Sequence, residues 1–213
     1  MIKVFIADDH AIVRKGLVQI LNDTPDMKLV GEGKNGTDVL DSLNKLDYDV
    51  LVLDISMPGR NGLDILKQLK EMKSCLPVLI LSMHPEEQYA KRVLKAGASG
   101  YLTKESASEE LINAIRIINN GRKYITANVA ESMADDLERN IKGPLHEKLS
   151  DREFEVMKLI AIGNTLSEIA DILSLSVKTI STNRSRILNK MNLKNNAELI
   201  CYAVKHDLVE LDI

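Results

Sequence analysis

The stretch VFIADDHAIV, residues 4–13, joins a short apolar run to two adjacent carboxylates. Val4 to Ala7 has the composition of a short interior strand, and Asp8 and Asp9 follow it with no Lys or Arg beside them. Two like charges about 4 Å apart repel by roughly 1 to 4 kcal/mol, depending on the local dielectric. The sequence therefore predicts another group that offsets this repulsion.

Further apolar runs follow within the first 120 residues. They are rich in Val, Ile and Leu and lie at Lys28–Gly31, Val50–Leu53, Val78–Leu81 and Gly100–Leu102. Helix-period stretches alternate with them near residues 11–22, 36–45, 62–72, 86–96 and 107–119. This alternation predicts an α/β domain, a doubly wound, flavodoxin-like sheet of five parallel strands with helices on both faces. Ligands of such sheets bind at the carboxyl ends of the strands.

After Gly121 the alternation stops, and only helical periods appear from Ser150 onward. We predict three segments: a domain over residues 1–121, a linker over 122–147 with a helix from about Asn128 to Arg139, and an all-α domain over 148–213. Ser150 and Glu153 fit a capping box. The four helices of that domain are expected at 151–162 (ended by Gly163), 167–173, 177–191 (capped by Ser176) and 197–205.

The composition excludes several classes of protein. No stretch approaches the roughly 18 uncharged apolar residues of a membrane span, and the first residues lack the pattern of a signal peptide. We therefore expect a cytoplasmic protein that makes no contact with a membrane. Cys75 and Cys201 stand alone, so neither a disulfide framework nor a zinc site is expected.

The ends of the predicted strands carry polar residues. Asp8 and Asp9 close the first strand, and Asp54, Ser82 and Lys104 close the third, fourth and fifth. Because these ends converge on one edge of the sheet, three carboxylates would meet there. Such a cluster suits Mg²⁺, while an ammonium and a hydroxyl suit phosphoryl oxygens. The pattern predicts an aspartate that accepts a phosphoryl group.

Each of these residues also has a simpler interpretation. An Asp at a strand end commonly caps the next helix, and a lone Lys is commonly a solvated charge. Their joint placement at the strand ends favours the site.

Four motifs, ADDH, LDISMPGRNG, LILSMH and KAGASGYLTK, resemble the receiver domain of bacterial response regulators of the NarL/FixJ type over about the first 120 residues. The resemblance implies that a sensor histidine kinase phosphorylates Asp54. It implies Mg²⁺ held by Asp8, Asp9, Asp54 and the backbone carbonyl of Ser56. It assigns Ser82 and Tyr101 to switch positions, with Tyr101 turning inward on phosphorylation, and Lys104 to the phosphate. Glu105 stands where many receivers have a proline after a cis bond.

The segment 177–197 contains basic residues and no acid, which favours a polyanionic partner. On the predicted helix 177–191, an apolar stripe is formed by Val177, Ile180, Ile187, Leu188 and Met191. The opposite face carries Lys178, Ser181, Thr182 and Ser185. A helix and a tight turn precede it, an arrangement that places a second helix in the major groove of double-stranded DNA.

Residues 149–199 resemble the LuxR-type helix-turn-helix domain, although many members have Lys at the position of Ser181 and His at that of Asn183. The resemblance implies DNA binding as a homodimer, at least when phosphorylated. We expect Lys178, Ser181, Thr182 and Ser185 to approach base edges, and Thr179, Arg186 and Lys190 to contact phosphates.

These features together predict a phosphorylation-controlled transcription regulator of a two-component system, not an enzyme. One alternative is a Mg²⁺-dependent phosphohydrolase of the haloacid dehalogenase type, which also uses an aspartyl phosphate. That family needs a second Asp two residues after the nucleophile, whereas Ser56 follows Asp54 at that distance. A receiver that acts only through protein contacts is a further alternative.

Overall fold

The computed structural model describes residues 1–57, 62–72, 75–139 and 144–209. It divides into two compact units, Met1–Glu138 and Arg139–Ile213, here called the amino-terminal unit and the helical unit. Within the described ranges, no helix is both long and apolar enough to cross a membrane.

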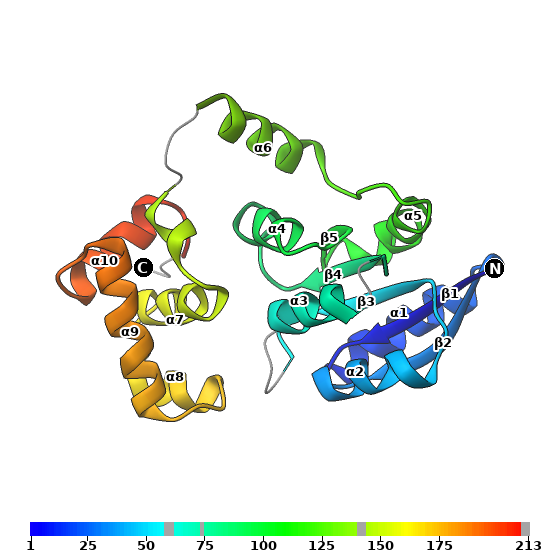
Figure 1. The fold of residues 1–213 in the computed structure, drawn as a ribbon, viewed down its shortest axis with the longest axis horizontal. Helices are drawn as coiled ribbons and strands as arrows, with labels where there is room; N and C mark the ends of the chain where they lie inside the picture. Colours follow the sequence, from blue (N-terminus) through cyan, green and yellow to red (C-terminus); the bar gives the residue numbers. More distant parts are fainter. Residues whose placement is uncertain (58–61, 73–74, 140–143, 210–213) are drawn as a thin grey trace. The chain divides into compact units, whose positions relative to one another are not determined.

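The amino-terminal unit contains the predicted parallel sheet of five strands, in the order β2-β1-β3-β4-β5 (Figure 1). The strands are β1 (Ile2–Ala7), β2 (Met27–Gly33), β3 (Val50–Asp54), β4 (Val78–Ser82) and β5 (Gly100–Thr103). The helices between and after them are α1 (Ala11–Asn22), α2 (Gly36–Lys45), α3 (Gly62–Met72), α4 (Glu86–Lys95) and α5 (Ala107–Asn119). The α/β prediction is confirmed, and β2 is longer than the apolar run that predicted it.

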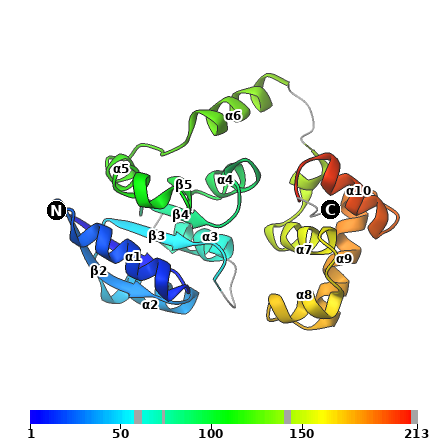
Figure 2. The same cartoon turned by 180° about the vertical axis from the view of Figure 1, so that it is seen from behind.

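The strand order decides which face of the sheet each helix covers. The chain moves from β1 to β2 in one direction and then from β2 through β3 and β4 to β5 in the other. Because parallel crossovers are right-handed, α1 lies on one face and α2, α3 and α4 lie on the other. Residues of α5 share a buried apolar cluster with α1, so α5 completes the first face (Figures 1 and 2).

The residues of β1 show how the sequence fits this sandwich. Val4 and Ile6 belong to the apolar cluster beneath α1 and α5. Phe5 points to the opposite face, where its ring stacks on Tyr48 with centroids 5.2 Å apart. The central strands β3 and β4 are buried along their whole length, which explains their unbroken apolar sequences.

The segment predicted as a linker contains a helix in the structure. A helix, α6 (Ala127–Arg139), begins one residue before the expected start, and its residues up to Glu138 group with the amino-terminal unit. A short 3₁₀ helix, η1 (Leu145–Lys148), was not predicted. The proposed boundaries at residues 121 and 147 stay predictions.

The helical unit contains α7 (Asp151–Ala161), α8 (Leu166–Ile172), α9 (Val177–Met191) and α10 (Asn196–Lys205). Ser150 caps α7 in the predicted capping box with Glu153, and Thr165 forms a second capping box with Glu168 at α8. Gly163, with φ +96°, follows the end of α7. These local signals explain why the helix limits were predictable within about a residue or two.

Gly62 lies against the strand end that carries Asp54. A Cβ atom added at Gly62 would lie 2.6 Å from the Ile55 Cα and 2.8 Å from the Asp54 carbonyl oxygen. We therefore expect Gly62→Ala to lower the free energy of unfolding by about 1 to 3 kcal/mol, as overpacking does. Urea denaturation of the full chain, followed by circular dichroism, measures this loss.

The matched control is Gly16→Ala on α1, where nothing lies within 4 Å of an added Cβ. Alanine is a better helix former than glycine, so this variant should gain about 0.5 to 1 kcal/mol. Equal stability of the two variants would contradict the close packing assigned to Gly62.

Candidate functional site

The polar strand ends meet at one edge of the sheet, as the sequence predicts. The register pairs Ala7 with Leu53, Asp54 with Leu81, and Ser82 with Thr103, so the residues at these ends are neighbours. Asp8, Asp54 and Ser82 have no exposed surface. A buried carboxylate requires a charged or hydrogen-bonding partner, because burial without one costs several kcal/mol.

Lys104 provides that partner. Its Nζ lies 2.7 Å from Asp54 Oδ2 and 2.9 Å from Asp8 Oδ2, and its side chain is 4% exposed. Burial lowers the pKa of Lys104, but the hydrogen bonds and charges of Asp54 and Asp8 outweigh it, and the net shift is upward. The ammonium is therefore charged at neutral pH and offsets part of the repulsion between the carboxylates.

Asp54 is buried, and both of its carboxylate oxygens accept hydrogen bonds. The Ser56 amide donates to its Oδ1 at 2.9 Å, while Lys104 holds Oδ2. Burial raises the pKa of Asp54, and these two hydrogen bonds offset only part of that effect. One oxygen of Asp54 is thus held by the backbone and the other by a mobile side chain.

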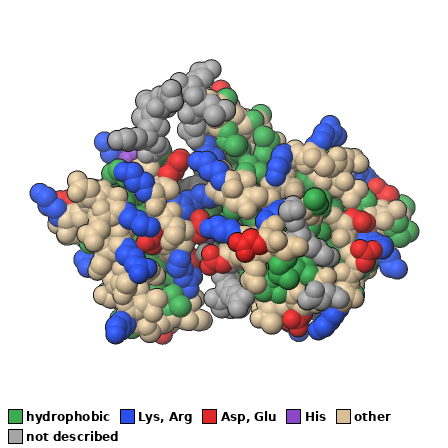
Figure 3. Space-filling model, viewed as in Figure 1, with side chains coloured by type: hydrophobic (Ala, Val, Ile, Leu, Met, Phe, Trp, Pro, Cys, Tyr) green, Lys and Arg blue, Asp and Glu red, His purple; other side chains and the backbone are tan. Residues whose placement is uncertain are grey.

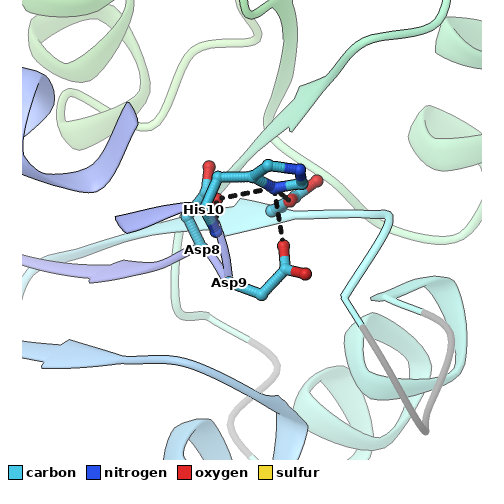
Figure 4. Close-up of side chains that lie close together, drawn as sticks. Asp8, Asp9 and His10 are labelled. Carbon is cyan, nitrogen blue, oxygen red and sulfur yellow. Dashed lines mark hydrogen bonds and ion pairs between the residues drawn. The ribbon is translucent and has the colours of Figure 1, made fainter. Parts of the chain in front are cut away.

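His10 is a neighbour of this site that the sequence analysis did not identify. Its backbone N–H donates to Asp8 Oδ1 at 2.7 Å, and its Nδ1 lies 2.8 Å from Asp9 Oδ1 (Figure 4). One ligand atom from each of Asp8, Asp9, His10 and Asp54 lies within 4.8 Å of the others. The position of His10 directly after the two carboxylates in the sequence is the signal that could have revealed this contact.

The donor set fits a divalent cation. Asp8 Oδ2 and Asp9 Oδ1 are buried, and each is contacted by one cationic or ring nitrogen, Lys104 Nζ at 2.9 Å and His10 Nδ1 at 2.8 Å, so each oxygen keeps a lone pair for a metal. Carboxylate oxygens with unused lone pairs are the ligands that Mg²⁺ prefers. Ser56 lies beside Asp54, whose Oδ1 accepts from its amide, and Ser56 is exposed.

The predicted switch residues lie on the next two strands. Ser82 Oγ accepts a hydrogen bond from the His84 amide at 3.0 Å. Tyr101 is 1% exposed, and its hydroxyl donates to the His84 carbonyl at 2.7 Å. The family resemblance implies that Tyr101 turns inward when the receiver is phosphorylated. Its ring is already buried in this structure because the His84 carbonyl satisfies its hydroxyl.

The Lys104–Glu105 peptide is trans, like every peptide bond of the described residues. The Lys104 amide donates to the Ser82 carbonyl at 2.8 Å, which fixes the start of this loop against β4. Glu105 is exposed.

Arg14 is a second residue that the sequence analysis missed. It is 8% exposed, and its Nη1 donates to the Asp8 carbonyl at 2.6 Å. Its Nε donates to Glu32 Oε2 at 2.9 Å. Arg14 shares the buried face of α1 with Leu17 and Leu21. An arginine three residues before one apolar position and seven before another, on the apolar face of a predicted helix, is the sequence signal for this role. We conclude that Arg14 holds the backbone that carries Asp8.

In the helical unit, α9 presents an exposed polar face. Lys and Arg side chains are spread over this unit on the face that Figure 3 shows. The exposed residues of α9 include all those predicted to contact DNA: Lys178, Thr179, Ser181, Thr182, Ser185, Arg186 and Lys190. Their contact with DNA stays a prediction.

The predicted apolar stripe of α9 needs one correction. Ile180, Ile187 and Met191 are fully buried, but Val177 is 46% exposed. Val177 is the first residue of the helix, where the chain has not yet turned onto the helical core. Asn183 is 9% exposed and lies on the buried side of the helix.

One ion pair and one hydrogen bond connect α9 to the other helices of its unit. Lys190 Nζ lies 2.6 Å from Oε2 of Glu153, whose side chain is 5% exposed. Arg184 Nε donates to Asn196 Oδ1 at 2.7 Å, at the start of α10. Lys190 was expected to be available to a phosphate, whereas in this structure it already has a carboxylate partner.

Comparisons with known proteins agree with this architecture. Residues 4–116 match the family described as the response regulator receiver domain, and residues 147–203 match the bacterial regulatory proteins of the luxR family. The response regulator UvrY of Escherichia coli K12 is 35% identical over 209 residues, covering 98% of this chain and 96% of UvrY. This chain belongs to the NarL/FixJ response regulators.

Other relatives match nearly the whole length of this response regulator. The oxygen regulatory protein NreC of Staphylococcus carnosus is 37% identical over 215 residues, covering 98% of this chain and 99% of NreC. The structure of RcsB from Salmonella enterica serovar Typhimurium, bound to promoter rprA with the phosphomimetic BeF3-, matches with 30% identity and a TM-score of 0.66. That match covers 96% of this chain and 99% of the RcsB chain.

Arg14→Met should weaken the response of the receiver to a divalent cation. The variant leaves the Asp8 carbonyl without its buried donor, which costs about 1 to 3 kcal/mol of stability and releases the carboxylates from their fixed position. We expect saturating Mg²⁺ to raise the unfolding midpoint of the unmodified protein, and to raise that of the variant by less. Thermal denaturation with and without Mg²⁺ measures both effects.

Glu32→Gln serves as the control for Arg14→Met. It keeps the Arg14 bond to the Asp8 carbonyl and removes one charge from a pair whose Glu32 side chain is 43% exposed. A surface pair of this kind contributes about 0 to 1 kcal/mol, so the Mg²⁺ response should be retained. A normal Mg²⁺ response in Arg14→Met would refute the positioning role.

Proposed function

We propose that this response regulator is a transcription regulator whose receiver is switched when a sensor histidine kinase transfers a phosphoryl group to Asp54. The observation that supports this most strongly is the environment of Asp54. Its carboxylate is buried at the end of the central strand, with Lys104 on one oxygen and the Ser56 amide on the other. Asp8 and Asp9 stand beside it.

Asp8, Asp9, Asp54 and the Ser56 carbonyl would hold Mg²⁺. When bound, the cation neutralises negative charge on the phosphoryl oxygens. The protein itself supplies position: Arg14 holds the Asp8 backbone, and the Ser56 amide orients the Asp54 carboxylate. Lys104, already at the site, is placed to follow the negative charge from the carboxylate to a phosphoryl oxygen.

Phosphorylation would replace the single charge of the Asp54 carboxylate by the nearly two negative charges of a phosphoryl group, placed further out from the strand end. Lys104 and the Ser82 hydroxyl are the groups within the site that can move toward that charge. Moving Ser82 alters its bond with the His84 amide, and the His84 carbonyl holds Tyr101. This rearrangement can change DNA binding in two ways, through dimerisation of the receiver or through release of the helical unit.

The proposed output is the binding of double-stranded DNA by α9, as a homodimer and in the cytoplasm where the DNA lies. The exposed face of α9 and the solved RcsB–DNA complexes, 30 to 31% identical, support this step. Lys178, Ser181, Thr182 and Ser185 would approach base edges. Thr179, Arg186 and Lys190 would contact phosphates, with Lys190 exchanging its Glu153 partner for one.

Asp54→Asn should abolish phosphorylation. Treating the full chain with acetyl phosphate and Mg²⁺ should place about one phosphoryl group on the unmodified protein and none on the variant, because an amide cannot form the acyl phosphate. Intact-mass measurement followed by peptide mapping locates the group. Label retained in Asp54→Asn would defeat the assignment of the phosphoacceptor.

The same preparation separates the regulator from the phosphohydrolase alternative. Steady turnover of a phosphomonoester by the unmodified protein would favour the enzyme, whereas a single bound equivalent favours the regulator. Gel shifts with genomic fragments test DNA binding directly. Their complete failure, with and without phosphorylation, would leave a receiver that acts only through protein contacts.

Arg186→Ala and Thr182→Ala should affect DNA binding in different ways. Arg186→Ala should weaken binding to all sequences alike and lower the salt dependence by about one phosphate contact. Thr182→Ala should instead change the preference between a matched and a mutated site. Binding titrations of both variants against both sites at several salt concentrations measure this difference.

Lys190→Ala is a less direct test of a phosphate contact, because it also leaves the buried Glu153 carboxylate without its ammonium partner. If Arg186→Ala alters sequence preference, or if Thr182→Ala lowers affinity for both sites equally, the rotation of α9 on DNA assumed here is wrong.

A further inference from the structure

The segment that leaves α5 returns to the edge of the receiver sheet. Gly121, with φ +76°, reverses the chain, and the Tyr124 amide donates to the Ser99 carbonyl at 2.9 Å. Tyr124 also forms an isolated parallel bridge with Gly100 on β5. The start of the linker thus covers part of the open edge of β5.

This return path depends on close packing and on one polar contact. A Cβ atom added at Gly100 would lie 2.9 Å from Tyr124 Cβ and 3.1 Å from the Tyr124 carbonyl oxygen, so glycine permits the approach. The Tyr124 hydroxyl donates to Glu110 Oε2 on α5 at 2.6 Å. Tyr124 is therefore held by both β5 and α5.

Thr126 joins the linker to a different helix. Its hydroxyl donates to Glu86 Oε2, at the first residue of α4, over 2.8 Å. The same Oγ1 accepts a hydrogen bond from the Val129 amide at 3.4 Å, in the first turn of α6. Val129 is 3% exposed. One hydroxyl thus contacts α4 and also caps α6, the linker helix that precedes the helical unit in the chain.

Glu86 is close to the switch. It lines a cavity of about 340 Å³ together with Ser82, Thr103 and Lys104. It also follows His84 by two residues, and His84 contacts both Ser82 and Tyr101 through its backbone. A movement of Ser82 and Lys104 toward a phosphoryl group would therefore displace the loop that ends at Glu86.

We propose that the Glu86–Thr126 hydrogen bond couples the state of the phosphoacceptor to the linker helix α6. The contact holds the first turn of α6 on α4 while Lys104 is bound to the Asp54 carboxylate. When Ser82 and Lys104 shift toward a phosphoryl group, the loop before α4 moves, the contact breaks and α6 loosens. This inference rests on the proposed phosphorylation of Asp54 and identifies the contact through which phosphorylation alters the linker helix α6.

Hydrogen exchange of the full chain tests this coupling. In the unmodified protein, acetyl phosphate with Mg²⁺ should raise the exchange rate of the amides of residues 129–134 by about fivefold or more, the lower end of usual allosteric coupling. Glu86→Ala and Thr126→Val should show the fast exchange without the phosphodonor and little further change with it. Their DNA affinity should depend correspondingly less on phosphorylation.

Two variants separate coupling from general damage to the linker. Thr126→Ser keeps the hydroxyl and should restore the wild-type response, while Tyr124→Phe removes the Glu110 contact and leaves the Glu86–Thr126 bond intact. Glu86→Ala retains the Thr126 cap of α6, so fast exchange in that variant cannot result from a lost cap. Incorporation of phosphate into Asp54 should remain normal in Thr126→Val.

The outcomes are distinguishable. If the unmodified protein acquires no phosphoryl group on Asp54, the proposed function fails and this inference fails with it. If Asp54 is phosphorylated and DNA affinity changes, but Glu86→Ala and Thr126→Val respond like the unmodified protein, the coupling through this bond is overturned and the proposed function stands.

Discussion

The ion pair between Lys104 and the buried carboxylates is the interaction on which the receiver depends. Asp8 and Asp54 have no exposed surface, and buried like charges would repel each other strongly without a counter-charge. The Lys104 ammonium lies within 2.9 Å of both carboxylates. The same group that stabilises the unmodified site is therefore the group that a phosphoryl group would attract, so stability and switching use one flexible side chain.

Backbone groups connect this ion pair to the rest of the receiver. The Lys104 amide binds the Ser82 carbonyl, and the two backbone groups of His84 bind Ser82 Oγ and the Tyr101 hydroxyl. Because these hydrogen bonds are at least partly shielded from water, a shift in one of them leaves another group poorly satisfied. The β4–α4 loop therefore tends to move as a unit, which makes the start of α4 a suitable place to attach the linker.

The helical unit illustrates how intramolecular hydrogen bonds limit what a binding surface can read. Thr182 Oγ1 donates to the Lys178 carbonyl and Ser185 Oγ to the Ser181 carbonyl. A hydroxyl has one proton to donate, so while these bonds persist the oxygens would act only as acceptors in the proposed contacts with bases. Such oxygens suit the amino groups of cytosine and adenine in the major groove. Lys178 remains the long charged side chain on that face.

Local sequence patterns determined the elements of this protein, and the tertiary structure decided which side chains meet. The alternating runs predicted five strands and the helices between them, and Ser150 with Glu153 predicted the start of α7. Both signals can be read locally because periodicity and capping act within a few residues. The convergence of Asp54, Ser82 and Lys104 followed from the parallel sheet alone. Other features did not follow from the sequence. They are the contact of Arg14 with a carbonyl, the burial of the Tyr101 ring, the pairing of Lys190 with Glu153 and the exposure of Val177. These depend on rotamers and on contacts between residues far apart in the chain, which only packing in three dimensions selects.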